Sequence, residues 1–265
     1  MPRWPHSLFR WKPRRKRFGT LNPMGTVVSP QLGNTREILV YLPYSYQRSR
    51  RRYSVIYMQD GQNLFDPRTS FAGDWGLLDG LTTLPRRTVE PIIVAISNAG
   101  EDRLSEYSPF VDAKGLGGQG DRYLDFVLDT VKPAIDQVFR TNAGRSGTGI
   151  AGSSMGGLIS LYGFFRRPES FGFVASLSPS LWFADRAIFP FVESAPHVPG
   201  KVYLDIGTAE GAESLANARR MRALLLAKGY RDGLDFRWME ESGGDHTEAA
   251  WGRRFKAALP FLLTP

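Results

Sequence analysis

Residues 148–158 read TGIAGSSMGGL, and this stretch decides the fold. Its first part, Thr148–Gly152, is a short apolar run typical of a buried strand, and the apolar residues after the glycines indicate a helix. Between them, a G-x-S-x-G pattern centres on Ser154. A serine on such a tight strand-to-helix turn takes a strained backbone pose that exposes its hydroxyl, and the flanking glycines remove Cβ atoms that would collide there. We therefore interpret Ser154 as a nucleophile; the alternatives are a glycine-rich turn with an incidental serine, and Ser153, which no glycine pair frames.

Strand-like and helix-like patterns alternate on both sides of this turn. Six apolar runs suit strands buried on both faces of a parallel sheet. The runs are Ser54–Met58, Pro91–Ile96, Thr148–Gly152, Gly172–Leu177, Lys201–Ile206 and Asp235–Met239. Apolar residues spaced three and four apart predict helices over residues 123–138, 218–229 and 251–262. We expect Pro133 to kink the first of these helices.

A hairpin precedes this alternation. Residues 25–44 hold two extended runs separated by Pro30, Gly33 and Asn34, which is typical of an antiparallel hairpin. The sequence therefore predicts a three-layer α/β fold with a mostly parallel central sheet and an N-terminal antiparallel hairpin. We expect a single domain over residues 20–265, since no interior linker divides it.

The net charge of +8 comes from the N-terminal fifth of the chain. Residues 1–52 hold twelve lysines and arginines and one acid, whereas residues 53–265 hold 22 basic and 25 acidic residues. We interpret residues 1–19 as a basic, solvated arm, with attraction to phosphates or anionic lipid as the alternative. Nothing downstream resembles a nucleic-acid module, so we expect no nucleic-acid partner.

The composition excludes several kinds of site. The chain has no cysteine, which excludes disulfides, thiolate metal sites and a cysteine nucleophile. With only three histidines, we expect no multi-histidine metal site. No apolar stretch approaches the ~20 residues that span a bilayer. The first 25 residues lack the apolar core of a secretory signal, so we expect a cytoplasmic protein.

A serine nucleophile needs a base, and His246 is the best candidate. It lies in a glycine-rich loop between the Asp235–Met239 strand and the last predicted helix, where ligands meet open sheets. The other histidines fit less well, since His6 lies in the basic arm and His197 in a proline-bounded connector. A solvated loop residue is the alternative for His246.

An acid is expected just after the Lys201–Ile206 strand, to orient the imidazole and stabilise its protonated form. Glu210 lies beyond this strand in a loop that can turn back toward His246. Asp205 is the alternative, but a strand residue points into a layer rather than across the top. Asp245 is poorly placed to orient its own neighbour. The order nucleophile, acid, histidine is that of an α/β-hydrolase.

An oxyanion site needs two N–H donors. The residue after the nucleophile, Met155, supplies one. The second should come from the loop that follows the Ser54–Met58 strand, which reads QDGQNLFD over residues 59–66.

Four segments now carry a family resemblance. They read YMQDGQNLF at 57–65, GSSMGG at 152–157, LDIGTAE at 204–210 and GGDH at 243–246. Together, and in this order, they look like the putative esterase family of α/β-hydrolases, which includes esterase D-like proteins, enterochelin esterases, feruloyl esterases and mycolyltransferases. The resemblance runs from about residue 20 to the end of the sequence.

The resemblance implies a serine esterase that works through an acyl-enzyme. Carried over by position, Ser154 is the nucleophile, Glu210 the acid and His246 the base. The N–H groups of Met155 and Gln62, the latter in preference to Gly61, form the oxyanion hole. No cofactor and no metal are required. The implied partner is a small-molecule ester with an aryl, sugar-linked or short-chain acyl group.

Six residues on loops near the site are candidate substrate contacts. They are Asp60, Asn63, Trp75, Arg103, Tyr107 and Trp182. The two tryptophans would suit a flat acyl group or a sugar ring, and ordinary loop packing is the alternative reading for both. Two other functions stay open: an acyltransferase on the same fold, and an inactive binding module that uses its basic arm.

Overall fold

The computed structural model describes residues 18–70, 73–82 and 89–264. The basic arm predicted over residues 1–19 lies outside this description, apart from Phe18 and Gly19. The strands are β1 (Thr20–Ser29), β2 (Asn34–Leu42), β3 (Val55–Met58), β4 (Ile92–Ile96), β5 (Thr148–Ser153), β6 (Phe173–Leu177), β7 (Lys201–Gly207) and β8 (Phe236–Glu241). The helices are α1 (Leu77–Thr82), α2 (Arg103–Glu106), α3 (Gly120–Asp125), α4 (Lys132–Val138), α5 (Met155–Arg166), α6 (Phe183–Arg186), α7 (Ile188–Ser194), α8 (Ala212–Ala227) and α9 (Glu248–Leu263).

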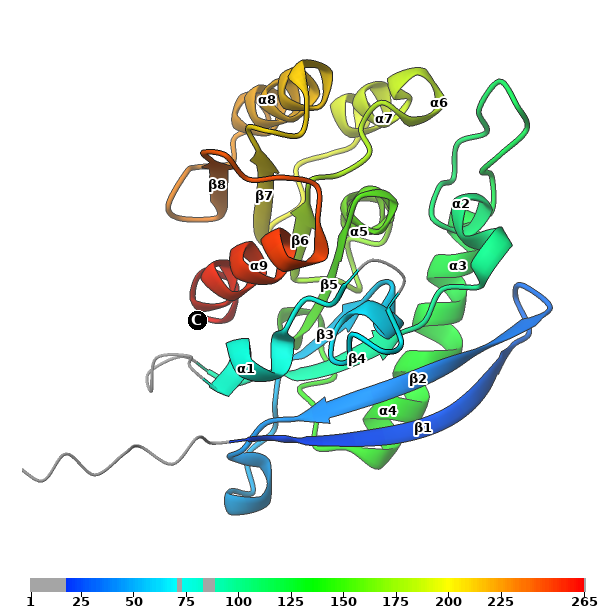
Figure 1. The fold of residues 1–265 in the computed structure, drawn as a ribbon, viewed down its shortest axis with the longest axis vertical. Helices are drawn as coiled ribbons and strands as arrows, with labels where there is room; N and C mark the ends of the chain where they lie inside the picture. Colours follow the sequence, from blue (N-terminus) through cyan, green and yellow to red (C-terminus); the bar gives the residue numbers. More distant parts are fainter. Residues whose placement is uncertain (1–17, 71–72, 83–88, 265) are drawn as a thin grey trace, which may run out of the picture.

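The strands form one sheet in the order β1-β2-β4-β3-β5-β6-β7-β8 (Figure 1). β1 and β2 are an antiparallel hairpin, and β2 pairs antiparallel with β4. From β4 to β8, each neighbouring pair is parallel. Each of the six strands predicted from the apolar runs is present, and so is the N-terminal hairpin. β8 lies at the edge of the sheet and is mostly only partly buried, so the expectation that the run Asp235–Met239 is covered on both faces is wrong. The predicted mostly parallel α/β fold is therefore confirmed.

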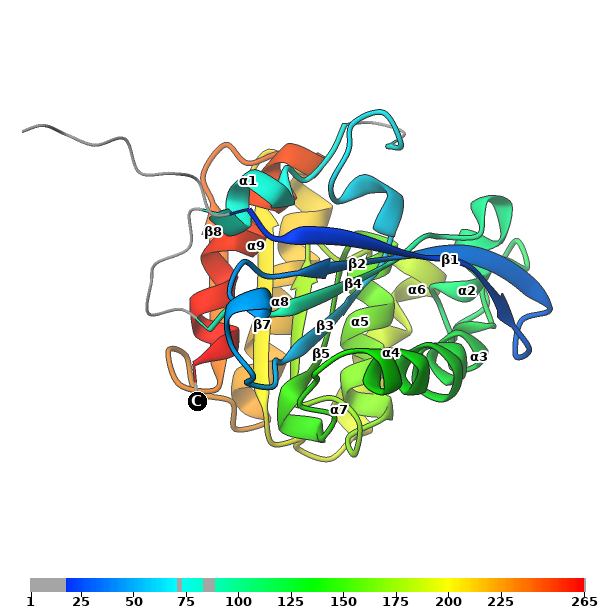
Figure 2. The same ribbon diagram turned by 90° about the horizontal axis from the view of Figure 1, so that it is seen from below.

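Helices cover both faces of this sheet and make three layers. One face packs against side chains of α3, α4, α5, α7 and α8. The other face packs against α1 and α9, which lie on the opposite side of the sheet from α4 and α5 in Figure 2. The inner strands are buried on both faces, which explains why their sequences are almost continuously apolar.

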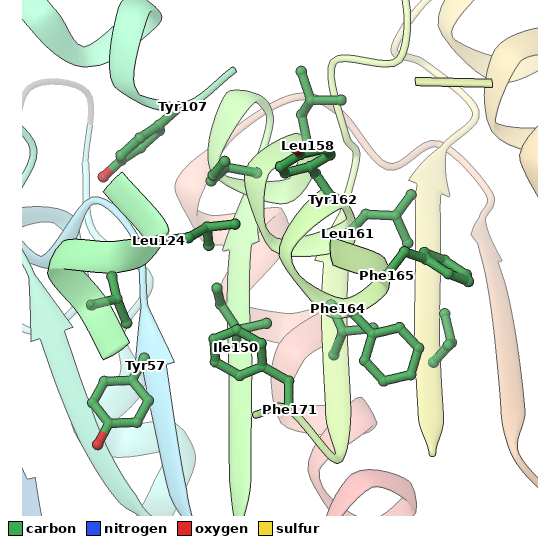
Figure 3. Close-up of a cluster of buried hydrophobic side chains, with 14 of the residues drawn as sticks. Tyr57, Tyr107, Leu124, Ile150, Leu158, Leu161, Tyr162, Phe164, Phe165 and Phe171 are labelled. Atoms are coloured by element: carbon green, nitrogen blue, oxygen red, sulfur yellow. The ribbon is translucent and has the colours of Figure 1, made fainter. Parts of the chain in front are cut away.

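Helix α5 lies at the centre of the larger core. Its residues from Met155 to Phe165 are all buried, so the helix is apolar on every side. Figure 3 shows its side chains close to Leu124 of α3 and Ile150 of β5. Gly163 allows this approach, because a Cβ there would lie 2.8 Å from Leu124 Cδ2 and 3.6 Å from Ile150 Cδ1. The helix that begins at the glycine-rich turn is thus held firmly against the sheet.

The helix predicted over residues 123–138 is irregular close to Pro133. A π-helical segment, Phe126–Val131, separates α3 from α4 and ends two residues before Pro133. Among all the described residues, no helix is long and apolar enough to cross a membrane.

Candidate active site

Four neighbouring parallel strands end at the same edge of the sheet and bring the predicted site residues together. Ser154 follows β5, Ser178 follows β6, Glu210 follows β7 and His246 follows β8. The pairing of Ser153 with Leu177, and of Leu177 with Asp205, aligns these strand ends. Residues far apart in the chain therefore meet at the carboxyl edge, where open α/β sheets bind ligands.

Ser154 occupies the strained turn that its glycines predict. Its φ of 55° and ψ of −123° are disfavoured for a residue with a side chain, at a cost on the order of 1–3 kcal/mol. The turn is held by hydrogen bonds from Ser154 N to Leu177 O at 3.0 Å and from Leu158 N to Ser154 O at 3.0 Å. A Cβ on Gly152 would lie 2.7 Å from the backbone of Gly156, so the turn requires glycine there.

His246 faces Ser154 from the loop before α9. Its Nε2 lies 3.1 Å from Ser154 Oγ, and its Nδ1 lies 2.7 Å from Oε2 of Glu210. A proton on Nδ1 that is donated to the carboxylate leaves Nε2 free to accept the hydroxyl proton. The ring stands edge-on to Trp251 with centroids 4.7 Å apart, and the side chain remains 46% exposed.

Glu210 is held by several donors. Its side chain is 1% exposed. Its Oε1 accepts hydrogen bonds from Ser178 Oγ at 2.6 Å, Gly207 N at 2.7 Å and Arg254 Nη2 at 3.1 Å. Burial acts to raise the pKa of Glu210, but its hydrogen bonds and the charge of Arg254 outweigh burial, so the net shift is downward. The carboxylate therefore stays ionised beside the imidazole.

The two alternative acids face other groups. Asp205 is fully buried, and its Oδ1 accepts from Ser178 N at 3.0 Å and lies 3.3 Å from Arg254 Nε. Burial raises the pKa of Asp205 to about 7, against the opposing effect of Arg254. Asp245 accepts a hydrogen bond from the Thr247 hydroxyl at 2.8 Å. Of the three acids weighed from the sequence, Glu210 is the one that contacts His246.

The two predicted N–H donors lie on elements that approach each other. Met155 is the first residue of α5, where a backbone N–H has no acceptor within the helix. Gln62 lies in a short 3₁₀ turn, Gly61–Asn63, that is entered through the left-handed residue Asp60. A Cβ on Gly156 would lie 2.9 Å from Gln59 Cβ and 3.3 Å from Asp60 Oδ2, so this loop lies against the first turn of α5.

Three of the predicted substrate contacts are bonded to one another and hold this loop in place. Arg103 binds Asp60 through two hydrogen bonds, Nε to Oδ1 at 2.7 Å and Nη2 to Oδ2 at 2.8 Å. Asn98 Nδ2 also donates to Asp60 Oδ1 at 2.7 Å. Tyr107 is fully buried, and its hydroxyl accepts from Asp60 N at 3.1 Å. Asp60 and Tyr107 are thus buried parts of the framework, whereas Arg103 keeps a partly exposed side chain.

The other three predicted contacts differ in exposure. Trp75 is buried and packs on Trp251 and Phe255, so its ring belongs to the core rather than to a pocket wall. Asn63 Nδ2 donates to Glu248 Oε1 at 3.4 Å, at the start of α9. Trp182 is 51% exposed, two residues after Ser180. Of the two tryptophans, only Trp182 has a face open to a ligand.

Three residues in the site were not singled out from the sequence. Ser180 Oγ lies 3.1 Å from Ser154 Oγ, and Ser178 binds Glu210. Arg254 contacts Glu210 from α9. A signal for the arginine existed, because Arg254 falls on the apolar stripe that begins at Trp251 and continues at Ala258. A charged residue is rarely buried without an ionic partner, so an arginine on a buried stripe predicts such a partner.

The described residues hold no group of three or more histidine, aspartate and glutamate side chains arranged to bind a metal ion. The arrangement that they do hold is a hydroxyl, an imidazole and a carboxylate in a row, next to the N-terminus of a buried helix. Chemically, such a row can remove the proton of the hydroxyl and share the resulting positive charge with the carboxylate.

Comparisons with known proteins identify the family of the chain. The family model described as "Putative esterase" matches residues 29–262. The uncharacterized protein YbbA of Bacillus subtilis strain 168 is 30% identical over 251 residues, which cover 90% of this chain and 96% of that protein. The iron(III) salmochelin esterase of Escherichia coli O6:H1 is 28% identical over 229 residues, covering 78% of this chain and 52% of that protein. The crystal structure of the BES protein from Bacillus cereus shares the fold, with a TM-score of 0.76 at 21% identity over 92% of this chain and 95% of that chain.

Proposed function

The chain belongs to the putative esterase family of carboxylic-ester hydrolases, and from this membership we propose that it is a serine esterase with Ser154 as its nucleophile. His246 acts as the general base and acid, and Glu210 orients and stabilises the imidazole. The N–H groups of Met155 and Gln62 hold the oxyanion. The single observation that supports this proposal best is the pair of contacts that joins the three side chains, 3.1 Å and 2.7 Å long.

The reaction proceeds in two halves. Ser154 Oγ attacks the ester carbonyl while His246 Nε2 takes its proton, and the carbonyl oxygen becomes a tetrahedral oxyanion. His246 then gives the proton to the leaving alcohol, and the acyl group remains on Ser154. A water molecule that loses a proton to His246 attacks this acyl-enzyme, and His246 returns the proton to Ser154 Oγ as the acid leaves. The two N–H donors lower the energy of both tetrahedral states because charge develops where they point.

The substrate is a small-molecule ester with an aryl, sugar-linked or short-chain acyl group. Trp182 supports the aryl and sugar classes, because its ring is half exposed and lies on the loop of Ser180, whose hydroxyl touches that of Ser154. The E. coli relative is named as an esterase of iron(III) salmochelin, which supports ester hydrolysis as the reaction type.

Hydrolysis of p-nitrophenyl acetate and butyrate tests this proposal. Ser154→Ala should lose nearly all turnover, on the order of 10³-fold or more, because the nucleophile is gone. Ser153→Ala is the matched control, since Ser153 is the buried neighbour in β5, and it should retain activity within about tenfold. Turnover by Ser154→Ala at the wild-type rate would exclude the proposed mechanism.

The assignment of the acid is tested by a second pair of variants. Glu210→Gln should lower kcat substantially but less than Ser154→Ala, because the amide cannot stabilise a positive imidazole. Asp205→Asn should lower kcat little, since Asp205 does not contact His246. The reverse ranking would move the role of the acid to Asp205.

A further inference from the structure

A buried arginine lies beneath the proposed catalytic residues. Arg254 belongs to α9, and its side chain is 1% exposed. Its Nη2 donates to Ser178 Oγ at 2.6 Å and to Glu210 Oε1 at 3.1 Å. Its Nη1 donates to Glu241 Oε2 at 3.2 Å, and its Nε lies 3.3 Å from Asp205 Oδ1. One guanidinium thus meets three carboxylates from β7, the loop after β7, and the end of β8.

We propose that Arg254 is a positioning residue for the esterase reaction, which clamps one oxygen of Glu210 and supplies the fixed positive charge that keeps this carboxylate ionised beside His246. This inference rests on the proposed function, because it assigns Arg254 a role through Glu210 and His246. Arg254 itself does not contact the reacting atoms.

The two carboxylate oxygens of Glu210 bind different groups, and this division is what makes Arg254 a clamp. Oε1 of Glu210 accepts from Gly207 N, Ser178 Oγ and Arg254 Nη2, while Oε2 accepts from His246 Nδ1. Arg254 also fixes the direction of the Ser178 hydroxyl. Because Ser178 Oγ accepts from Arg254, its own proton is free to go to Glu210. Three donors on one oxygen therefore leave the other directed at the imidazole.

The packing around the guanidinium shows that the neighbouring loops leave room for it only because they carry glycine. A Cβ on Gly207 would lie 2.9 Å from Arg254 Nη1, and a Cβ on Gly244 would lie 3.0 Å from the same atom. Gly207 precedes Glu210, and Gly244 precedes His246. The backbones of the two loops are also joined, by a hydrogen bond from Ala209 N to Gly244 O at 2.9 Å. Both loops that carry the proposed acid and base therefore close directly over Arg254.

The charges around His246 give the electrostatic part of the argument. The negative groups are Asp205, Glu210 and Glu241, which contact Arg254, Glu248 in the first turn of α9, and the exposed Asp245, which directly precedes His246. Arg253 also pairs with Glu241, but its side chain is 61% exposed and therefore well screened by water. The hydroxyl of Tyr203 donates to the backbone carbonyl of Arg254. Within the contacts of this cluster, Arg254 is the buried positive charge that offsets the carboxylates.

Arg254 favours the ionised form of the carboxylates of Asp205 and Glu210. With Arg254 present, burial raises the pKa of Asp205 to about 7, while the pKa of Glu210 is lowered despite its burial. Removing the guanidinium makes the cluster more negative by one charge, so Asp205 and Glu210 bind a proton more readily. A protonated Glu210 no longer stabilises a positive imidazole.

The NMR signal of the Nδ1 proton that His246 donates to Glu210 tests this inference without relying on turnover. The chain has only three histidines, so the signal of His246 is identified by its loss in His246→Gln. In Arg254→Met, which keeps length but removes the fork and the charge, this signal should shift upfield, because Glu210 is no longer held against the imidazole. Arg253→Met, the exposed neighbour, should leave the signal where it is in the wild type. An unshifted signal in folded Arg254→Met would overturn the proposal.

Kinetics on the same variants separates the clamp from the charge. The acid limb of kcat/KM should move upward in Arg254→Met, because Glu210 is then protonated at higher pH and cannot stabilise a positive imidazole. Arg254→Lys should lower kcat by about tenfold with little change in KM, because one ammonium cannot reproduce the fork that binds Ser178 and Glu210. If Arg254→Met does not fold, Arg254→Lys decides: wild-type kcat in that variant contradicts the clamp. Activity of Ser154→Ala is measured in parallel, since a fully active Ser154→Ala refutes the serine mechanism, whereas an inactive one with unshifted Arg254 variants refutes only the role of Arg254.

Discussion

The hydroxyl oxygens of Ser154 and Ser180 lie 3.1 Å apart, which equals the distance from Ser154 Oγ to His246 Nε2. Ser154 has one proton to donate. When it donates to the imidazole, the hydrogen bond with Ser180 must run from the Ser180 hydroxyl to Ser154 Oγ. Ser180 therefore restrains the rotamer of the proposed nucleophile and points a donor at the oxygen that gives up its proton.

Replacing Ser180 measures what this restraint contributes. Ser180→Ala should lower kcat by about two- to tenfold, since a single hydrogen bond contributes about 0.5–1.5 kcal/mol. Steady-state kinetics on p-nitrophenyl acetate provides the measurement, with unfolding midpoints as the control for stability. A loss as large as that of Ser154→Ala would mean that Ser180 does more than restrain its neighbour.

The raised pKa of Asp205 predicts how stability depends on pH. In the folded protein the pKa is about 7, against an ordinary value of 3.8, so the native state binds the extra proton between these values. The contribution of Asp205 to stability is therefore present at low pH and is lost as pH rises from about 4 to about 7. Asp205→Asn removes this dependence. Urea unfolding at pH 5 and pH 8 should show the wild type losing about 1–3 kcal/mol relative to Asp205→Asn.

The matched control for this experiment is Asp102→Asn, because Asp102 is an exposed residue of a surface turn. It should leave the pH dependence of the wild type intact. If the wild type and Asp205→Asn follow parallel curves between pH 5 and pH 8, the burial of Asp205 does not govern its titration.

Gly61 is expected to be intolerant of a side chain. A Cβ there would lie 2.5 Å from Ala95 C and 2.6 Å from Ile96 N, in the backbone of β4. Gly61→Ala should push the Gly61–Asn63 turn outward, with a loss of about 1–3 kcal/mol in stability and of about 10²-fold in kcat as the N–H of Gln62 moves. Gly144→Ala is the control, since a Cβ on Gly144 meets nothing within 4 Å and should cost no more than ~0.5 kcal/mol. Equal effects of the two variants would show that the close approach of Gly61 to β4 is unimportant.

The two tryptophans proposed from the sequence should behave in opposite ways. Trp75→Ala should lower the free energy of unfolding by about 3–5 kcal/mol, because the buried ring packs on Trp251 and Phe255. Trp182→Ala should change stability by less than ~1 kcal/mol, since half of the ring is already in water. It should also raise KM for p-nitrophenyl benzoate more than for p-nitrophenyl acetate. An equal effect on both esters would argue against an aryl contact at Trp182.

The strands were predictable because their environment leaves a clear pattern. A parallel strand covered on both faces needs apolar side chains at every position, as in Ile92–Ile96 and Phe173–Leu177. The family resemblance drawn from four short segments is likewise confirmed by the match over residues 29–262. The region from Phe183 to Ser194 was not predicted as helices. There Ala184, Asp185 and Arg186 take positive φ values, which no propensity of these residues indicates.

Within the site, the sequence predicted best what local geometry requires. A serine between two glycines marks a strained turn wherever it occurs after a strand, so Ser154 was visible without any tertiary information. Trp75 and Trp182 could not be separated, because burial depends on which helix comes to lie over each ring. Ser178 was missed for a similar reason, since its left-handed backbone and its bond to Glu210 arise only once β6 and β7 are paired.

The position of α9 has a consequence for the order of events during refolding. The strained turn at Ser154 is hydrogen-bonded to β6 and α5, whereas α9 carries the guanidinium on which the loops of Glu210 and His246 rest. α9 packs mainly on β6, β7 and α1, all of which lie earlier in the chain. After dilution from denaturant, the return of far-ultraviolet ellipticity should therefore precede the return of turnover. The lag between the two signals measures how long α9 takes to dock.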